Sequence, residues 1–163
     1  MPAVLNSKIY GQRFNHLANL FAKYSALEIT LGITRQAKRL TMATDLENIQ
    51  RLLDRFKRPI PSGDDYQTRL VEEFELILSQ RFTDYFLQIC DIIDLTTDLT
   101  HMTRGSAGSS LVCYLLGITD VDPIKWNIPV ARFMNPMRDD LPDVDIDFEH
   151  HRQTEVMERI FRK

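Results

Sequence analysis

The chain has 163 residues, of which 44% are hydrophobic and 26% are charged, and its formal net charge is −3. This composition suits a soluble domain of medium size or part of a larger protein, and the slightly acidic balance argues against a protein whose whole surface binds nucleic acid. We expect a cytoplasmic protein without a membrane contact, because no apolar run approaches a membrane span and the N-terminus lacks the pattern of a signal peptide. Cys90 and Cys113 lack the spacing of a zinc site or a disulfide framework, so we expect two structural thiols.

The first hundred residues show the periodicity of helices. Apolar residues recur every three or four positions in four stretches: Phe14 to Tyr24, Leu46 to Phe56, Tyr66 to Leu78 and Tyr85 to Ile93. Thr44 or Asp45 is a plausible cap for the second helix, and Thr83 for the fourth.

The clearest internal break in composition runs from Pro59 to Gly63 and includes Pro61-Ser62-Gly63. We take it as a candidate domain boundary. The pattern therefore predicts a helical region of unknown role over residues 1–63 and a second region over residues 64–163.

Basic residues gather in one part of the helical half. They are Arg35, Lys38, Arg39, Arg51, Arg55, Lys57 and Arg58. Such a cluster either binds a phosphate backbone or forms the solvated surface of a helix, and we favour the second interpretation.

After Arg104, the small residues from Gly105 to Ser110 lead directly into the apolar run Leu111 to Leu116, which ends at Gly117. A turn of this kind before a helix directs free backbone N–H groups and the positive end of the helix dipole outward, where they can bind an anion. The turn is not a Walker A loop, because no Lys follows its last Gly. An ordinary turn with a serine cap explains the same residues without a ligand.

Cationic side chains follow this turn. Lys125, Arg132 and Arg138 surround Asn135-Pro136, and an Arg near a metal-bound triphosphate can bind two of its oxygens at once. Each of these residues taken alone is typical of a protein surface.

Near the C-terminus three aspartates alternate with apolar residues, in the order Asp143-Val144-Asp145-Ile146-Asp147-Phe148. On a strand this alternation places the three acids on one face, with neighbours about 6.5–7 Å apart. Carboxylates so close together repel one another unless a cation such as Mg²⁺ neutralises them. An acidic edge strand with one wet face is the alternative interpretation.

A last amphipathic helix is predicted from Val156, Met157, Ile160 and Phe161, which we expect to pack beneath the strand. The histidines are His16, His101, His150 and His151. His101 or His150 could contact nucleotide or a metal-bound water, but we favour surface positions for all four.

The residues from Tyr66 onward resemble the palm of the C-family polymerases, the alpha subunits of bacterial DNA polymerase III. Four motifs carry the resemblance: Arg104-Gly-Ser-Ala-Gly-Ser-Ser, Gly117-Ile-Thr-Asp-Val-Asp-Pro123, Arg132-Phe-Met-Asn-Pro136 and Pro142-Asp-Val-Asp-Ile-Asp-Phe148. The resemblance covers roughly residues 66–163, and residues 1–65 match no known pattern. It implies an α+β fold in which part of a nucleotidyltransferase palm of the polymerase beta type, with a short antiparallel sheet and flanking helices, follows the helical half.

The resemblance also implies roles for individual residues. Asp143 and Asp145 correspond to the first two metal-binding catalytic aspartates, and Asp147 lies in the same motif without belonging to that pair. Gly105, Ser106 and Arg132 correspond to the groups that bind the incoming nucleotide. The implied reaction is DNA-directed DNA synthesis with two Mg²⁺ ions, on primer-template DNA and deoxynucleoside triphosphates, together with the remaining polymerase domains or replication subunits.

Two functional interpretations stay open at this point. In the first, the chain is part of a DNA polymerase palm and is inactive alone, because the family's third catalytic aspartate lies beyond Lys163. In the second, it is a non-catalytic remnant or accessory module that binds nucleotide, metal or a polymerase partner.

Overall fold

The computed structural model describes residues 35–138 and 140–162, with side chains from Thr44 onward. The chain divides into two compact units, Met1–Glu47 and Asn48–Lys163. Of the first unit only a stretch of helix is described, and the predicted helix from Phe14 to Tyr24, with His16, lies outside the described residues. The division of domains after residue 63 stays a prediction.

The first described helix, α2, covers Arg35–Leu53. The prediction of a cap at Thr44 or Asp45 is wrong, because both residues lie inside this helix. A side chain can cap a helix only where the preceding backbone is not helical, and here the helix has already begun. Phe56 lies beyond the end of α2, where its ring stacks on that of Phe74 at 6.4 Å between centroids.

The next two helices confirm the periodicity. α3 covers Asp64–Ser79 and follows the irregular Pro59–Gly63 segment, and α4 covers Thr83–Asp94. Phe74 and Phe86, one from each helix, are fully buried. The predicted cap at Thr83 is wrong, because Phe82 is the N-cap residue of α4 and Thr83 is a buried residue of its first turn.

The basic residues around the end of α2 bind acids of the protein itself. Arg51 pairs with Asp84 at 2.9 Å, and Lys57 pairs with Asp94 at 2.7 Å. Arg55 contacts two acids of α4, Asp91 at 3.0 Å and Asp94 at 2.8 Å. Arg58 pairs with Asp120 at 2.5 Å. This part of the basic cluster is therefore an exposed or partly exposed surface whose cations pair with the protein's own acids, which agrees with the favoured interpretation of a solvated surface.

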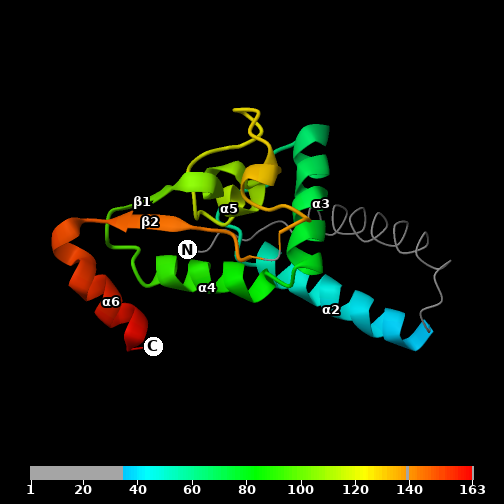
Figure 1. Cartoon of the computed structure of the whole chain (residues 1–163), viewed down its shortest axis with the longest axis horizontal. Coiled ribbons are helices and arrows are strands. Elements are labelled where there is room, and N and C mark those ends of the chain that lie inside the picture. The colour runs from blue at the N-terminus through cyan, green and yellow to red at the C-terminus, as the bar shows by residue number, and fades with distance from the viewer. Residues whose placement is uncertain (1–34, 139, 163) are drawn as a thin grey trace. The chain divides into compact units, whose positions relative to one another are not determined.

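Two antiparallel strands form the sheet. β1 covers His101–Arg104 and β2 covers Asp145–Phe148, with Arg104 opposite Asp145 and His101 opposite Phe148. Figure 1 shows the two strands side by side, and the helices around them confirm the α+β class. Asp143 lies in the segment that leads into β2 rather than in the strand itself. Asp145 and Asp147 share one face of β2, as their alternation predicted.

The turn after β1 continues as a short 3₁₀ helix, η2, over Gly105–Ser109, and α5 follows over Leu111–Leu115. Ser110 caps α5, since its hydroxyl accepts a hydrogen bond from the backbone N–H of Cys113. α5 packs against α3. Cys90 and Cys113 are buried free thiols, and burial raises the pKa of both, that of Cys90 to about 11, so both are the structural thiols that were expected.

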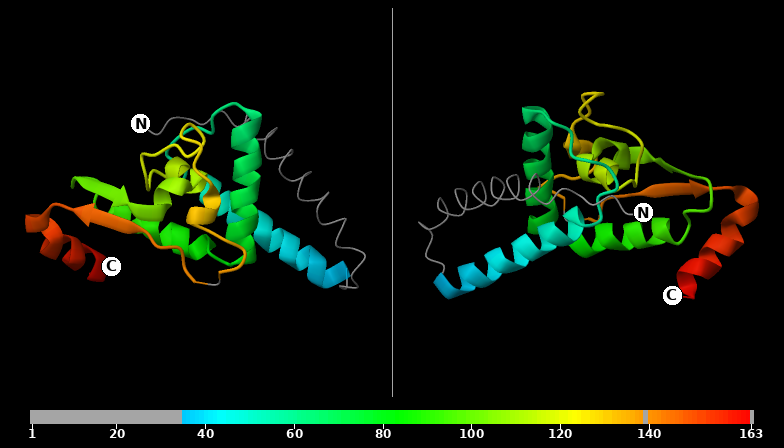
Figure 2. Two further views of the ribbon diagram at one scale, coloured as in Figure 1. Left: turned by 45° about the horizontal axis from the view of Figure 1, so that its top comes forward. Right: turned by 180° about the vertical axis from the view of Figure 1, so that it is seen from behind.

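The C-terminal elements are the 3₁₀ helices η3 (Val130–Arg132) and η4 (His150–Arg152) and the helix α6 (Gln153–Phe161). Both views of Figure 2 show α6 turning back after β2. The prediction that its whole apolar face packs is only partly right, because Val156 is 4% exposed but Phe161 is 79% exposed. Arg159 joins α6 to the residues after α4 through hydrogen bonds to Asp98 and to the carbonyl of Leu95. In the described residues we find no helix with the length and apolar character that crossing a bilayer requires.

Candidate functional site

The turn after β1 lies against the acidic segment. Gly105 has φ of 77°, and a Cβ built on it would lie 3.1 Å from Oδ2 of Asp145. The hydroxyl of Ser106 donates a long hydrogen bond of 3.4 Å to the carbonyl oxygen of Asp143. Each of the two residues of the predicted phosphate-binding turn therefore contacts one of the two predicted metal-binding aspartates.

The three alternating aspartates have different surroundings. Asp147 accepts a hydrogen bond of 2.9 Å from Nη2 of Arg104 and forms an ion pair with Nε of the same side chain. Within the described part of the chain neither Asp143 nor Asp145 has an ion-pair partner, and both are exposed. The carboxylates of Asp143 and Asp145 are therefore open to an added cation, whereas that of Asp147 is already neutralised.

Two carboxylates are an incomplete set of metal ligands. The residues that the structure describes contain no cluster of three or more His, Cys, Asp or Glu side chains suited to a metal ion. Mg²⁺ usually binds through one or two carboxylates and completes its six oxygen ligands with water and substrate phosphates. The oxygen-only donors at Asp143 and Asp145 fit that ion.

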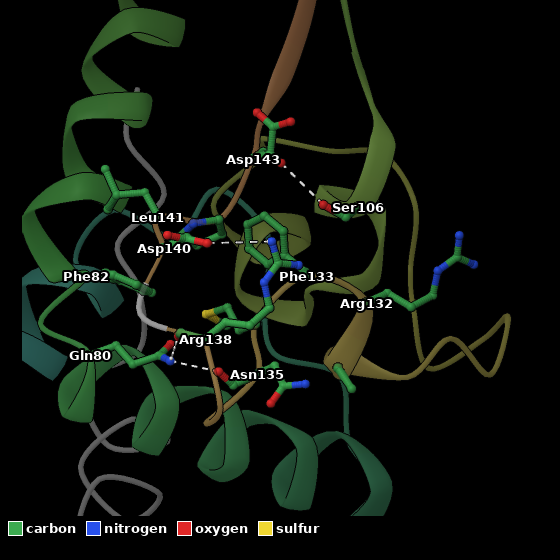
Figure 3. A pocket seen from close by; sticks show the side chains of 13 residues that line it. Gln80, Phe82, Ser106, Arg132, Phe133, Asn135, Arg138, Asp140, Leu141 and Asp143 are labelled. Carbon is green, nitrogen blue, oxygen red and sulfur yellow. Dashed lines mark hydrogen bonds and ion pairs between the residues drawn. The ribbon is translucent and has the colours of Figure 1, made fainter.

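A pocket joins the residues that the sequence singled out in separate motifs (Figure 3). Ser106 after β1, Arg132 in η3 and Asp143 before β2 all line it. Its other lining residues are Gln80, Phe82, Ala131, Phe133, Met134, Asn135, Arg138, Asp140, Leu141 and Pro142. The pocket thus joins residues of three separate motifs at one concave surface, together with Arg138 and Asp140.

The three predicted cations are placed differently. Arg138 pairs with Asp140 at 3.9 Å, and Figure 3 shows its guanidinium among the lining residues. The Arg132 side chain extends away from Asp143 in that view. Lys125 does not line the pocket, and its ammonium lies 5.7 Å from the centre of the Trp126 ring. Arg138 is therefore the cation whose guanidinium lies among the lining residues, whereas Arg132 lines the pocket with a side chain directed away from Asp143.

The segment that carries Arg138 and Asp143 is bound to the helices behind it. Nε2 of Gln80 donates hydrogen bonds of 2.9 and 2.7 Å to the carbonyls of Asn135 and Arg138. The hydroxyl of Tyr85 donates to the carbonyl of Pro142, the residue before Asp143. One wall of the pocket is thus held by the end of α3 and the start of α4.

The N-terminus of α5 is bonded to an acid of the protein itself, which corrects the prediction that its backbone N–H groups are free. The backbone N–H groups of Leu111 and Val112 donate to the carboxylate of Glu73, at 2.7 and 2.9 Å. The hydroxyl of Ser110 donates to the same carboxylate at 2.7 Å. A buried side chain from α3 therefore occupies the position that the helix dipole offers to an anion. The serine-cap alternative is confirmed for this end of the turn.

Sequence reasoning missed Glu73, although a signal was present. Leu70, Phe74 and Ile77 form the apolar stripe of α3, and Glu73 lies on the same face. A glutamate at a core position implies a partner inside the protein, because an unpaired buried charge is costly. Glu73 is 0% exposed, and burial raises its pKa above the ordinary value while its hydrogen bonds and Arg69 act in the opposite direction.

None of the three described histidines lines the pocket. The ring of His101 lies 5.9 Å from that of Phe148, at the far end of the strand pair from Gly105. His150 and His151 are exposed residues of η4, and His151 lies 3.3 Å from the carboxylate of Glu149. The positions of His150 and His151 agree with the surface interpretation, whereas His101 is a half-buried residue of β1.

A family model described as the bacterial DNA polymerase III alpha NTPase domain matches residues 19–163. The chain belongs to this family. Among its relatives, the DNA polymerase III subunit alpha of Staphylococcus aureus (strain MRSA252) is 42% identical over 115 residues, which are 69% of this chain and 11% of that protein. The error-prone DNA polymerase of Bdellovibrio bacteriovorus is 39% identical over 111 residues, 67% of this chain and 10% of that protein.

Two facts follow for this member of the DNA polymerase III alpha family. The chain spans about a tenth of the length of these relatives. The match begins at residue 19, so the interpretation that residues 1–65 match no known pattern is wrong for most of that stretch. The sequence motifs lie after residue 100, whereas the helices before them carry only an apolar periodicity that many proteins share.

Proposed function

We propose that this chain contributes part of the catalytic palm of a DNA-directed DNA polymerase, with Asp143 and Asp145 as metal ligands and with Gly105, Ser106 and Arg132 as nucleotide-binding groups. The single observation that carries the proposal is the pocket that Ser106, Arg132 and Asp143 all line, with Gly105 against Asp145. Nucleotidyl transfer depends on positioning and on neutralising phosphate charge, and this pocket supplies groups for both.

Each residue has a specific task in this proposal. Gly105 has no side chain, so a phosphate can approach its backbone closely. The Ser106 hydroxyl orients a phosphate oxygen, and the Arg132 guanidinium turns toward the triphosphate and binds it. Asp143 and Asp145 hold Mg²⁺, which when bound neutralises the triphosphate and lowers the pKa of the primer 3′-hydroxyl.

The proposal also covers the fold of the palm, the cellular location and the substrates. β1 and β2 belong to the antiparallel sheet of a nucleotidyltransferase palm related to polymerase beta, in a cytoplasmic protein that acts on primer-template DNA and deoxynucleoside triphosphates. The described residues hold no cluster of three or more His, Cys, Asp or Glu side chains suited to a metal ion. Turnover therefore requires further residues from the remaining polymerase domains or replication subunits, and the described part alone binds without catalysing.

Isothermal titration calorimetry tests the site by measuring the affinity of the chain for a deoxynucleoside triphosphate with and without Mg²⁺. Asp143→Asn/Asp145→Asn should weaken the Mg²⁺-dependent affinity at least tenfold, because it removes both charged metal ligands without changing side-chain size. Asp64→Asn/Asp65→Asn is the matched control, since these two acids are exposed, do not line the pocket, and lose the same charge. Equal Mg²⁺-dependent affinities in the two double variants would refute the assignment.

A chimera separates the catalytic interpretation from the non-catalytic module. This chain should support primer extension when it replaces the matching segment of a family polymerase, and Asp143→Asn in the chimera should abolish extension. A chimera that binds nucleotide but extends no primer would favour an accessory module.

A further inference from the structure

Two residues of α3, the buried Glu73 and the half-buried Arg69, contact residues at or next to the Gly105–Ser109 turn and η3. Glu73 accepts three hydrogen bonds from Ser110, Leu111 and Val112, which directly follow the Gly105–Ser109 turn. Arg69, one helical turn earlier, lies 3.6 Å from the Glu73 carboxylate and has a side chain only 14% exposed. These contacts join α3 to the end of the turn that carries Ser106.

Arg69 also bridges the turn to the segment that carries Arg132. Its Nη1 donates a hydrogen bond of 3.3 Å to the carbonyl of Ser109, and its Nη2 donates one of 2.8 Å to the carbonyl of Ile128. Ile128 precedes η3, the short 3₁₀ helix that contains Arg132. One guanidinium therefore spans two segments that are distant in sequence and that present Ser106 and Arg132 to the same pocket.

We propose that Arg69 and Glu73 are positioning residues, which set the placement of the Gly105–Ser109 turn relative to η3 so that one triphosphate can contact Ser106 and Arg132 together. This inference rests on the proposed function for its nucleotide. The turn and η3 are too short to hold this geometry themselves, because a 3₁₀ helix of three to five residues has few internal hydrogen bonds. The bonds from α3 supply the missing constraint.

The carboxylate of Glu73 can position the turn, which an apolar side chain that only fills the core cannot do. An apolar side chain would fill the space but would leave the Ser110 hydroxyl and two backbone N–H groups without an acceptor. Glutamine has the same size but presents an NH₂ group to at least one of these donors. Glu73→Gln therefore disturbs the turn while it changes the packing little.

The first experiment measures nucleotide affinity in a double-mutant cycle with the whole chain, using Mg²⁺ and a deoxynucleoside triphosphate as the probe. Glu73→Gln should weaken affinity about tenfold, and Glu75→Gln, an exposed glutamate of the same helix, should leave it unchanged. In a Ser106→Ala background the effect of Glu73→Gln should shrink below about threefold, because the turn no longer contributes its hydroxyl. Full additivity would overturn the inference, since a purely structural loss of stability does not depend on Ser106.

The second experiment needs no ligand, so its failure is distinguishable from failure of the proposed function. Amide hydrogen exchange should accelerate at least tenfold over residues 105–113 in Glu73→Gln and over residues 128–133 in Arg69→Gln, with α4 as the unchanged internal reference. Arg69→Gln keeps the three hydrogen bonds that Glu73 accepts. It therefore serves as the test if Glu73→Gln does not fold. Exchange as slow as in wild type would overturn the inference even if nucleotide binds, and accelerated exchange would support it even if nucleotide does not.

Discussion

Two groups of acids in this chain have opposite surroundings. Asp84, Asp91 and Asp94 of α4 each pair with Arg or Lys from the end of α2 or the turn after it. In the described part of the chain Asp143 and Asp145 form no ion pair, and they lie instead beside a glycine turn and a pocket. Charge density in a sequence is therefore a poor guide to function, because the first group neutralises the protein's own cations and only the second is open to a ligand.

The largest effect on stability is expected from a substitution of Gly105, the glycine beside Asp145. Gly105→Ala should lower the free energy of unfolding by about 1–2 kcal/mol, because a side chain at positive φ is strained, and its Cβ would lie 3.1 Å from the Asp145 carboxylate. It should also weaken Mg²⁺-dependent nucleotide binding. Both quantities can be measured by urea denaturation and calorimetry.

Gly108→Ala is the matched control for this change. A Cβ at Gly108 would meet the Val121 side chain at an ordinary 3.6 Å. Stability should therefore change by less than about 0.5 kcal/mol. Equal losses in the two variants would mean that neither the positive φ of Gly105 nor its approach to Asp145 makes a side chain costly there.

A smaller loss of stability is expected when one acid from each of the two groups is replaced. Asp94→Asn should lower the free energy of unfolding by about 0.5–1 kcal/mol, a value limited by solvent screening of its half-exposed pairs with Arg55 and Lys57. Asp143→Asn should cause no loss, because it removes no ion pair. A loss at Asp143 as large as that at Asp94 would show that the site acid also stabilises the fold.

The smallest expected effect concerns the pH dependence of α6. A hydrogen bond from Arg159 lowers the pKa of Asp98 to about 2, and hydrogen bonds from Arg152 and Arg159 lower that of Glu155 to about 2. Because these folded-state values lie below the unfolded ones, their stabilisation is present above about pH 4.5 and is lost as the pH falls toward 2.

Arg159→Met tests this expectation in chemical denaturation at several pH values. The difference in stability between wild type and the variant should shrink between about pH 4.5 and pH 2. Arg162→Met, whose arginine side chain is 81% exposed, is the control and should show a smaller pH dependence. A difference that does not change with pH would contradict the assignment.

The local patterns of the sequence predicted much of this structure. The apolar stripes predicted α3 and α4, and the alternation from Asp143 to Phe148 predicted the shared face of Asp145 and Asp147. Both are local properties, since a side chain's face follows from its position along a regular element. The start of α2 was missed, because cap residues also occur inside helices.

The partners of the charged residues could not be predicted from local patterns. Which Arg meets which Asp depends on contacts between elements far apart in the chain, such as Arg55 with Asp91. The same holds for the N-terminus of α5, where Glu73 arrives from α3 to occupy the place of the predicted anion. The position of Glu73 within an apolar stripe was the one local sign of that arrangement.

The hydrogen bonds from Gln80 and Tyr85 to the wall of the pocket have a consequence for recognition. The carbonyls of Asn135, Arg138 and Pro142 are already fixed before any ligand arrives. A ligand that enters therefore loses little binding free energy to ordering this backbone, and selectivity depends on whether its shape suits a rigid surface.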